Sequence, residues 1–179
     1  MPMSSQKALT LLSSLILIGL TSCGGSVSQC KQLASPINEA KGFVQEYEQD
    51  MDQALAQFSS AQNLGDINTA AKDYISAVEK ARAQLDAIAQ ETSNASIDDE
   101  QLNEYRQQYV TLLTQWNGAL TSARDAMQPL TEASTEEEAR NVFSRFQAQT
   151  DSAYSAIQTI DLQEAALIEG INAYCDASS

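Results

Sequence analysis

Hydrophobic residues recur along most of this chain in alternating steps of three and four, the spacing that gives an α-helix one buried face. The first stripe is widened by Phe43 and Leu55 and comprises Leu33, Ile37, Ala40, Val44, Tyr47, Met51, Ala54, Phe58 and Ala61. Comparable stripes cover 67–88, 102–126 and 139–160. The pattern predicts four long helices.

Residues that cap or break helices separate these segments. Asp66 and Ser134 are expected N-caps, Ser134 forming a capping box with Glu137, and Pro129 is expected to end the third helix. These signals place three short loops at 62–66, 93–98 and 128–134.

Two helix boundaries stay open at this point. Pro36 is either the first residue of the first helix or lies inside a helix that begins near Ser28, which we favour because Cys30 then joins the apolar stripe. The phase of the last stripe changes at Asp161, which indicates either a separate final helix or one continuous helix with a slight bend.

Short connections between long helices are typical of an up-down-up-down four-helix bundle. We therefore expect an all-α domain over residues 28–176, elongated and monomeric. An extended dimeric coiled coil would show the same stripes, but the breakers in each loop argue against it.

The first residues follow a different pattern. Lys7 precedes the apolar run Ala8–Leu20, which has the length of a signal-peptide core and is short for a membrane span. Leu20-Thr21-Ser22-Cys23 then resembles the lipobox of bacterial lipoproteins. This resemblance implies removal of residues 1–22 as a signal peptide, a lipid on Cys23, and anchorage to the periplasmic face of a bacterial membrane, inner or outer. Ordinary secretion with a free Cys23 thiol is the alternative.

Residues 23–27, rich in glycine and serine, are expected to form a flexible tether. An even number of antiparallel helices returns the chain to the end where it began, so Cys30 and Cys175 should be neighbours. Exported proteins can form disulfides, and with Cys23 lipidated these two cysteines are the remaining pair. Two separate thiols are the alternative.

The segments around these cysteines carry a second resemblance. Ser28-Gln29-Cys30, with Leu33, and Ile171-Asn172, with Tyr174-Cys175, are similar to the two ends of a group of small cyanobacterial helical lipoproteins. The resemblance implies export, lipidation and the terminal cysteine pair, and it implies no particular activity.

Composition narrows the possible chemistry. The chain has 179 residues, no histidine and a formal net charge of −14. A surface this acidic repels nucleic acid, and without histidine the familiar catalytic triads and haem or di-iron sites cannot be built. We expect no enzymatic activity, cofactor or metal. The acidic runs at 98–100 and 136–138 suit helix N-termini better than calcium sites.

One aromatic group, Tyr105, Tyr109 and Trp116, follows the third stripe. It could line a pocket for an apolar ligand, although core packing is the favoured interpretation. The function we expect is therefore a structural or interaction module that docks on a membrane-bound protein. The alternative is a protein that binds a small apolar ligand or a cation inside the bundle.

Overall fold

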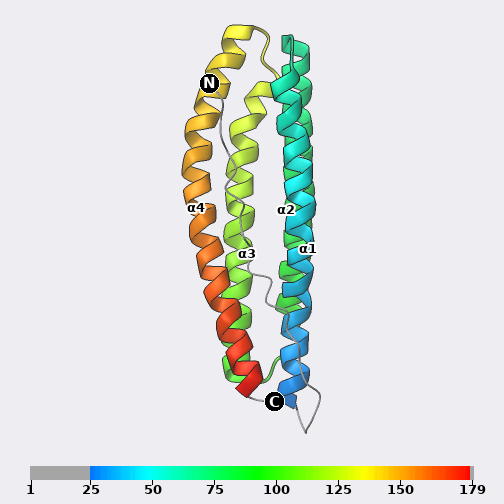
Figure 1. The fold of residues 1–179 in the computed structure, drawn as a ribbon, viewed down its shortest axis with the longest axis vertical. Coiled ribbons are helices and arrows are strands. Elements are labelled where there is room, and N and C mark those ends of the chain that lie inside the picture. Colours follow the sequence, from blue (N-terminus) through cyan, green and yellow to red (C-terminus); the bar gives the residue numbers. More distant parts are fainter. Residues whose placement is uncertain (1–24, 178–179) are drawn as a thin grey trace.

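In the residues that it describes, the computed structural model has only helices as regular structure, as the stripes predict. It describes residues 25–177, excepting the side chains of residues 25–26, 147–154 and 156. The elements are α1 (Gly25–Ser60), α2 (Leu64–Asn94), α3 (Glu100–Met127), the 3-10 turn η1 (Gln128–Thr131) and α4 (Glu136–Ala177) (Figure 1). The expected signal peptide (1–22), Cys23 and Gly24 lie outside the described residues.

The four α-helices lie side by side and form a rod (Figure 1). α1 packs mainly on α2, α2 on α3, and α3 on α4. The connection between α1 and α2 lies at the same end as η1, and we call this the distal end. The opposite end holds the start of α1, the end of α4 and the connection between α2 and α3, and we call it the clasp end.

Each helix buries part of the apolar stripe that the sequence predicts. The core includes residues from all four helices, among them Leu33, Ile37, Val78, Leu85, Leu102, Tyr109, Leu120, Phe146, Leu167 and Ile171. Removing these side chains from water is the main force holding the helices together. Leu55, which the pattern placed at the edge of the first stripe, is instead 45% exposed.

The helix starts differ from expectation at two places. The N-cap of α2 is Asn63 and not Asp66, because the Asp66 N–H donates to Asn63 Oδ1 at 3.0 Å. The cap of α4 is Thr135 and not Ser134, because the Glu138 N–H donates to Thr135 Oγ1 at 3.1 Å. In both cases several residues able to cap stand together, and the residue directly before the first helical residue takes the role.

The two boundaries that the sequence left open are continuous in the structure. Pro36 lies inside α1, so the helix begins before it, and Gly25 is already helical where a tether was expected. α4 runs through Asp161 without a break. Asp161 is not followed by a glycine or proline, so the change of phase alone does not end the helix.

A short 3-10 turn plugs part of the core at the distal end. The 3-10 turn η1 follows α3 directly, contains Pro129, and packs on α2, α3 and α4. Its Leu130 is fully buried. The same connection is tied to α2 by Asn68, whose Nδ2 donates to the carbonyl oxygen of Ala133 at 3.1 Å. The connection therefore contributes to the core as well as joining two helices.

Candidate functional sites: the clasp and the distal pocket

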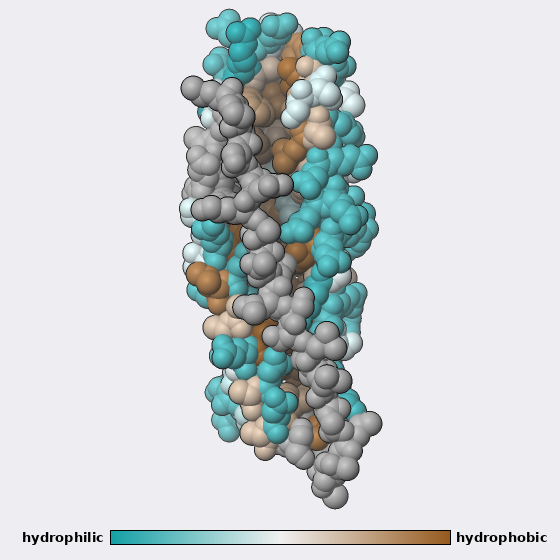
Figure 2. Space-filling model, viewed as in Figure 1, coloured by the Kyte–Doolittle hydropathy of each residue, from teal (hydrophilic) through white to brown (hydrophobic). Residues whose placement is uncertain are grey.

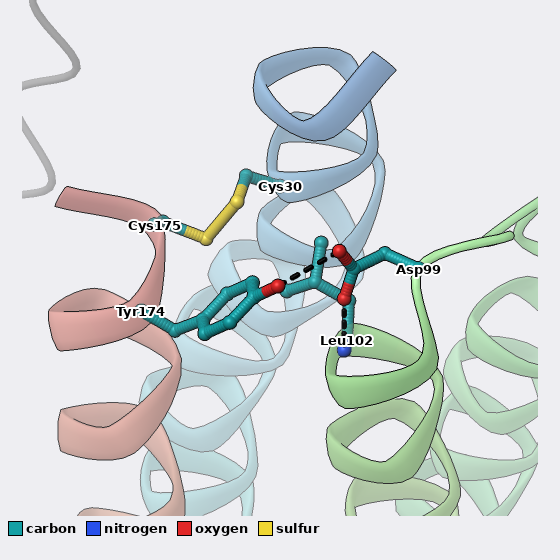
Figure 3. Close-up of a disulfide and its surroundings, with 5 residues drawn as sticks. All are labelled: Cys30, Asp99, Leu102, Tyr174 and Cys175. Atoms are coloured by element: carbon teal, nitrogen blue, oxygen red, sulfur yellow. Dashed lines mark hydrogen bonds between the residues drawn. A yellow bond between two sulfur atoms is a disulfide. The ribbon is translucent and has the colours of Figure 1, made fainter. Parts of the chain in front are cut away.

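The expected disulfide joins α1 to α4 at the clasp end (Figure 3). Cys30 and Cys175 have Cα atoms 5.9 Å apart and are 145 residues apart in the chain. Both cysteines are buried, at 2% and 8% exposure. The pairing inferred from helix topology is thus present in the structure.

The residue before each cysteine holds the loop that precedes α3. Gln29 Oε1 accepts hydrogen bonds from the N–H groups of Asp98 and Asp99, at 2.8 and 2.9 Å. Tyr174 donates its hydroxyl hydrogen to Asp99 Oδ2 at 2.7 Å, while Asp99 Oδ1 caps α3 by accepting from Leu102 N at 3.0 Å (Figure 3). We call the disulfide together with Gln29, Tyr174 and Asp99 the clasp. It connects α1, α3 and α4.

The hydrogen bonds from the Leu102 N–H and then from Tyr174 hold the pKa of Asp99 below its usual range. The ionised carboxylate therefore stabilises the fold above the unfolded pKa, and this contribution is lost as pH falls through the folded pKa.

Replacing Tyr174 with Phe is expected to lower the melting temperature at neutral pH, since it removes a hydrogen bond to a charged acceptor. The difference from the native chain should vanish in acid. Thermal unfolding followed by circular dichroism across the pH range measures both effects. Tyr105→Phe is the matched control, because Tyr105 packs edge-on against Tyr174 at 6.3 Å but does not bind Asp99. Equal losses in both variants would contradict this role of Tyr174.

The three aromatic candidates for a ligand pocket are not gathered around one cavity. Tyr109 is fully buried in the core, and Trp116 packs against the core at the edge. Tyr105 lies beside Tyr174 and near Gly170, where an added Cβ would come within 3.3 Å of the Tyr105 hydroxyl. None of the three lines the pocket described below.

A buried polar group lies where α3 faces α4. The Tyr109 hydroxyl approaches Glu164 without completing a hydrogen bond, and burial followed by the charge of Glu164 raises its pKa. Burial also raises the pKa of Glu164, with a further contribution from Asp161, while Tyr109 and Lys41 act in the opposite direction. The folded state thus favours the neutral form of Glu164.

The fold is therefore expected to gain stability at low pH from Glu164, and to lose that gain as pH rises through the folded pKa of this group. Replacing Glu164 with Gln should raise the melting temperature near pH 7 and have little effect near pH 4, where the carboxyl is increasingly protonated. Glu169→Gln, an exposed change on the same helix, is the control. A lower melting temperature for Glu164→Gln at neutral pH would show that the charge is needed.

The distal end carries an apolar pocket of about 480 Å³ between the α1–α2 connection and the start of α4. Phe58 and Phe143 form its aromatic wall, with ring centroids 6.1 Å apart. Its lining residues are Phe58, Ala61, Gln62, Asn63, Leu64, Ile67, Glu136, Ala139, Arg140, Phe143 and Ser144. The sequence pattern placed Phe58 and Phe143 in the core stripes, yet Phe143 is 37% exposed.

The structure offers few other candidates. Within residues 25–177, excluding the side chains not described, no group of three or more acidic or cysteine side chains could hold a metal ion. In the same part of the chain no helix has the length and hydrophobicity needed to cross a membrane. In the acidic run at 98–100 Asp99 caps α3, and in the run at 136–138 the Glu138 carboxylate accepts hydrogen bonds from the N–H and hydroxyl of Ser134 just before α4.

Comparison of the chain with protein-family models, with curated proteins and with solved structures finds no match. The features of the structure that bear on function are therefore the clasp, the distal pocket and the charges around them.

Proposed function

We propose that this chain is an exported, lipid-anchored protein whose helices form an up-down-up-down bundle, and that it binds a membrane-bound protein partner without catalysing a reaction. The observation that carries the proposal is the placement of the clasp and the distal pocket at opposite ends of the rod (Figure 1). Cys23 precedes Cys30 by seven residues, a span of at most about 25 Å. A lipid on Cys23 would hold the clasp end near the membrane and present the distal pocket away from it.

The strong negative charge supports a protein partner over direct contact with lipid. With a formal net charge of −14, the bundle surface is repelled by anionic headgroups. Attachment to the membrane then depends on the covalent anchor, and the bundle remains free to meet a second protein.

The anchor is tested by producing the full chain in bacteria supplied with an alkyne fatty acid. The native chain should carry the label and sediment with membranes, whereas Cys23→Ala should lose the label and leave the membrane fraction. Ser28→Ala, close to the same site, is the control and should behave as the native chain does. An unlabelled native chain would overturn the anchor.

The partner is tested with a photo-crosslinking amino acid introduced at one of two exposed positions on α4, in membranes with the anchor intact. Ser144 lines the distal pocket, and Gln163 lies on the half of α4 nearer the clasp. We expect one specific membrane protein to be crosslinked from position 144 and not from position 163. The absence of a specific crosslink from both positions would count against the proposal.

The size of the distal pocket favours one second candidate, a carrier of a small apolar ligand. About 480 Å³ falls within the range of small-molecule sites. The test is binding of a fluorescent fatty acid. Saturable binding that raises the melting temperature of the native chain, and that Phe143→Ser abolishes, would support this candidate over a protein partner.

A further inference from the structure

We infer that the distal pocket and the adjoining groove between α1 and α4 bind a cationic amphipathic helix of the partner. The inference rests on the proposed function and adds the chemistry of the segment that is bound. Such a helix would place a large apolar side chain in the pocket and its lysine or arginine residues against acidic side chains of α1.

The apolar surface at the distal end extends beyond the pocket. Leu55 lies one turn before Phe58 on α1 and is 45% exposed, and Phe143 on α4 is 37% exposed. Figure 2 shows hydrophobic residues between α4 and α1 toward the distal end, with hydrophilic residues to either side. A small molecule held within the pocket would leave Leu55 in water, whereas a helix laid along the groove would cover it.

The groove exists because α1 and α4 have different main neighbours. α1 packs chiefly on α2 and α4 chiefly on α3, so α1 and α4 make little direct contact with each other. At the distal end the Phe58–Phe143 ring pair spans the space between them. The floor of the groove is therefore apolar and its two sides are helices.

Acidic side chains border this groove on α1. Glu48 and Asp52 precede Leu55 by seven and three residues, which places all three on one face of the helix. Glu46 and Asp50 lie on another face, where both bind Lys80 of α2. Glu48 and Asp52 are exposed and make no ion pair among the described residues, so they are available to a cationic partner.

On α4 the groove is bordered by Glu136 and Arg140, whose side chains form an ion pair at 3.3 Å while being 72% and 78% exposed. An exposed pair of this kind contributes little to stability. A basic residue of the partner can therefore form an ion pair with Glu136 in place of Arg140 with little loss of folding stability. No basic residue occurs from residue 42 to residue 66, so the α1 side remains uniformly acidic.

Charge also decides against other occupants. A second copy of this chain would bring another net charge of −14 to the same groove. An anionic lipid surface would be repelled in the same way. A cationic helix is the occupant whose charge and shape both match.

The test uses the full chain in nanodiscs of zwitterionic lipid, with empty nanodiscs as the blank. The probe is a fluorescein-labelled helical peptide of about 18 leucine and lysine residues, and its leucine–glutamate counterpart is the peptide control. Binding is measured by fluorescence anisotropy. A benzophenone in the probe then identifies the residues that it contacts.

Two pairs of variants separate groove binding from attraction to bulk charge. Glu48→Lys with Asp52→Lys is compared with Asp73→Lys with Glu91→Lys, which changes the net charge equally at exposed positions on α2. Phe143→Ser is compared with Leu162→Ser, because Leu162 is 74% exposed. All four sets change exposed or partly exposed side chains and should leave the fold intact.

We expect the first member of each pair to weaken lysine-peptide binding by about ten-fold or more, and its control by less than about two-fold. Crosslinks should fall on α1 near Leu55 and on α4 near Phe143. Equal weakening by both charge variants, or equal binding of the leucine–glutamate peptide, would overturn the inference. If the peptide fails while position 144 still crosslinks to a membrane protein, the inference is wrong and the proposed function stands.

Discussion

Replacing Cys30 and Cys175 together with alanine is expected to lower the free energy of unfolding by up to about 5 kcal/mol. The bond closes a loop between residues 145 apart, and the entropy that such a loop removes from the unfolded chain sets this upper limit. Urea unfolding followed by circular dichroism measures the change. α1 and α4 each keep their main packing partner, so we expect a weaker fold with its helices retained.

The loss of stability should be greatest at the clasp end. Amide hydrogen exchange should rise most at the start of α1 and the end of α4, because the disulfide holds these two segments together. Chemical reduction of the native chain should give a similar loss and serves as the control for the alanine substitutions. A change below about 1 kcal/mol would show that the other clasp contacts suffice.

Replacing Leu130 with alanine is expected to destabilise the fold by about 2–5 kcal/mol, the range for large-to-small changes at buried positions. Leu130 is fully buried although it lies in a four-residue 3-10 turn, and this turn packs on three helices. The truncation would leave a cavity at the distal end that the short turn cannot easily fill.

Leu162→Ala is the matched control, because it removes the same atoms from a side chain that is 74% exposed. It should change the free energy of unfolding by no more than about 0.5 kcal/mol. Urea unfolding of both variants gives the comparison. Similar losses for the two leucines would mean that η1 does not plug the core.

The sequence predicts the existence of the helices because the stripes leave few alternatives. A step of three and four sustained over Leu33, Ile37 and Ala40 has no counterpart in a strand. The disulfide was predictable for the same reason, since topology alone brings Cys30 and Cys175 to one end. Periodicity thus carries information about which residues face inward.

The N-caps of the helices were harder to predict, because neighbouring residues can fill the same role. Asn63 and Asp66 can both cap α2, and Ser134 and Thr135 can both cap α4. In each case the residue that is not the N-cap also makes a hydrogen bond near the helix start. Asp66 Oδ2 accepts from the Gln62 N–H at 2.9 Å, and the Ser134 N–H donates to the Glu138 carboxylate. The choice depends on where the turn enters the bundle, which tertiary packing decides.

The candidate sites, too, could be predicted from the sequence only in part. Gln29 and Tyr174 stand beside the cysteines in the sequence, but their hydrogen bonds to the loop before α3 depend on a third helix being present. Phe143 follows the apolar stripe and is nevertheless part of a pocket, because a stripe does not reveal whether neighbouring helices extend far enough to cover it. Pockets at the ends of a bundle escape pattern analysis for this reason.

The clasp also has a mechanical consequence. If the chain is held at Cys23 and pulled at the distal end, the force enters α1 near its first turns and is shared with α4 through the disulfide. From there α1 and α4 carry the load side by side, each bearing part of it. While the disulfide is intact, the 145-residue span between its cysteines cannot be drawn out as a single strand, so an anchored partner complex could be pulled only against two helices at once.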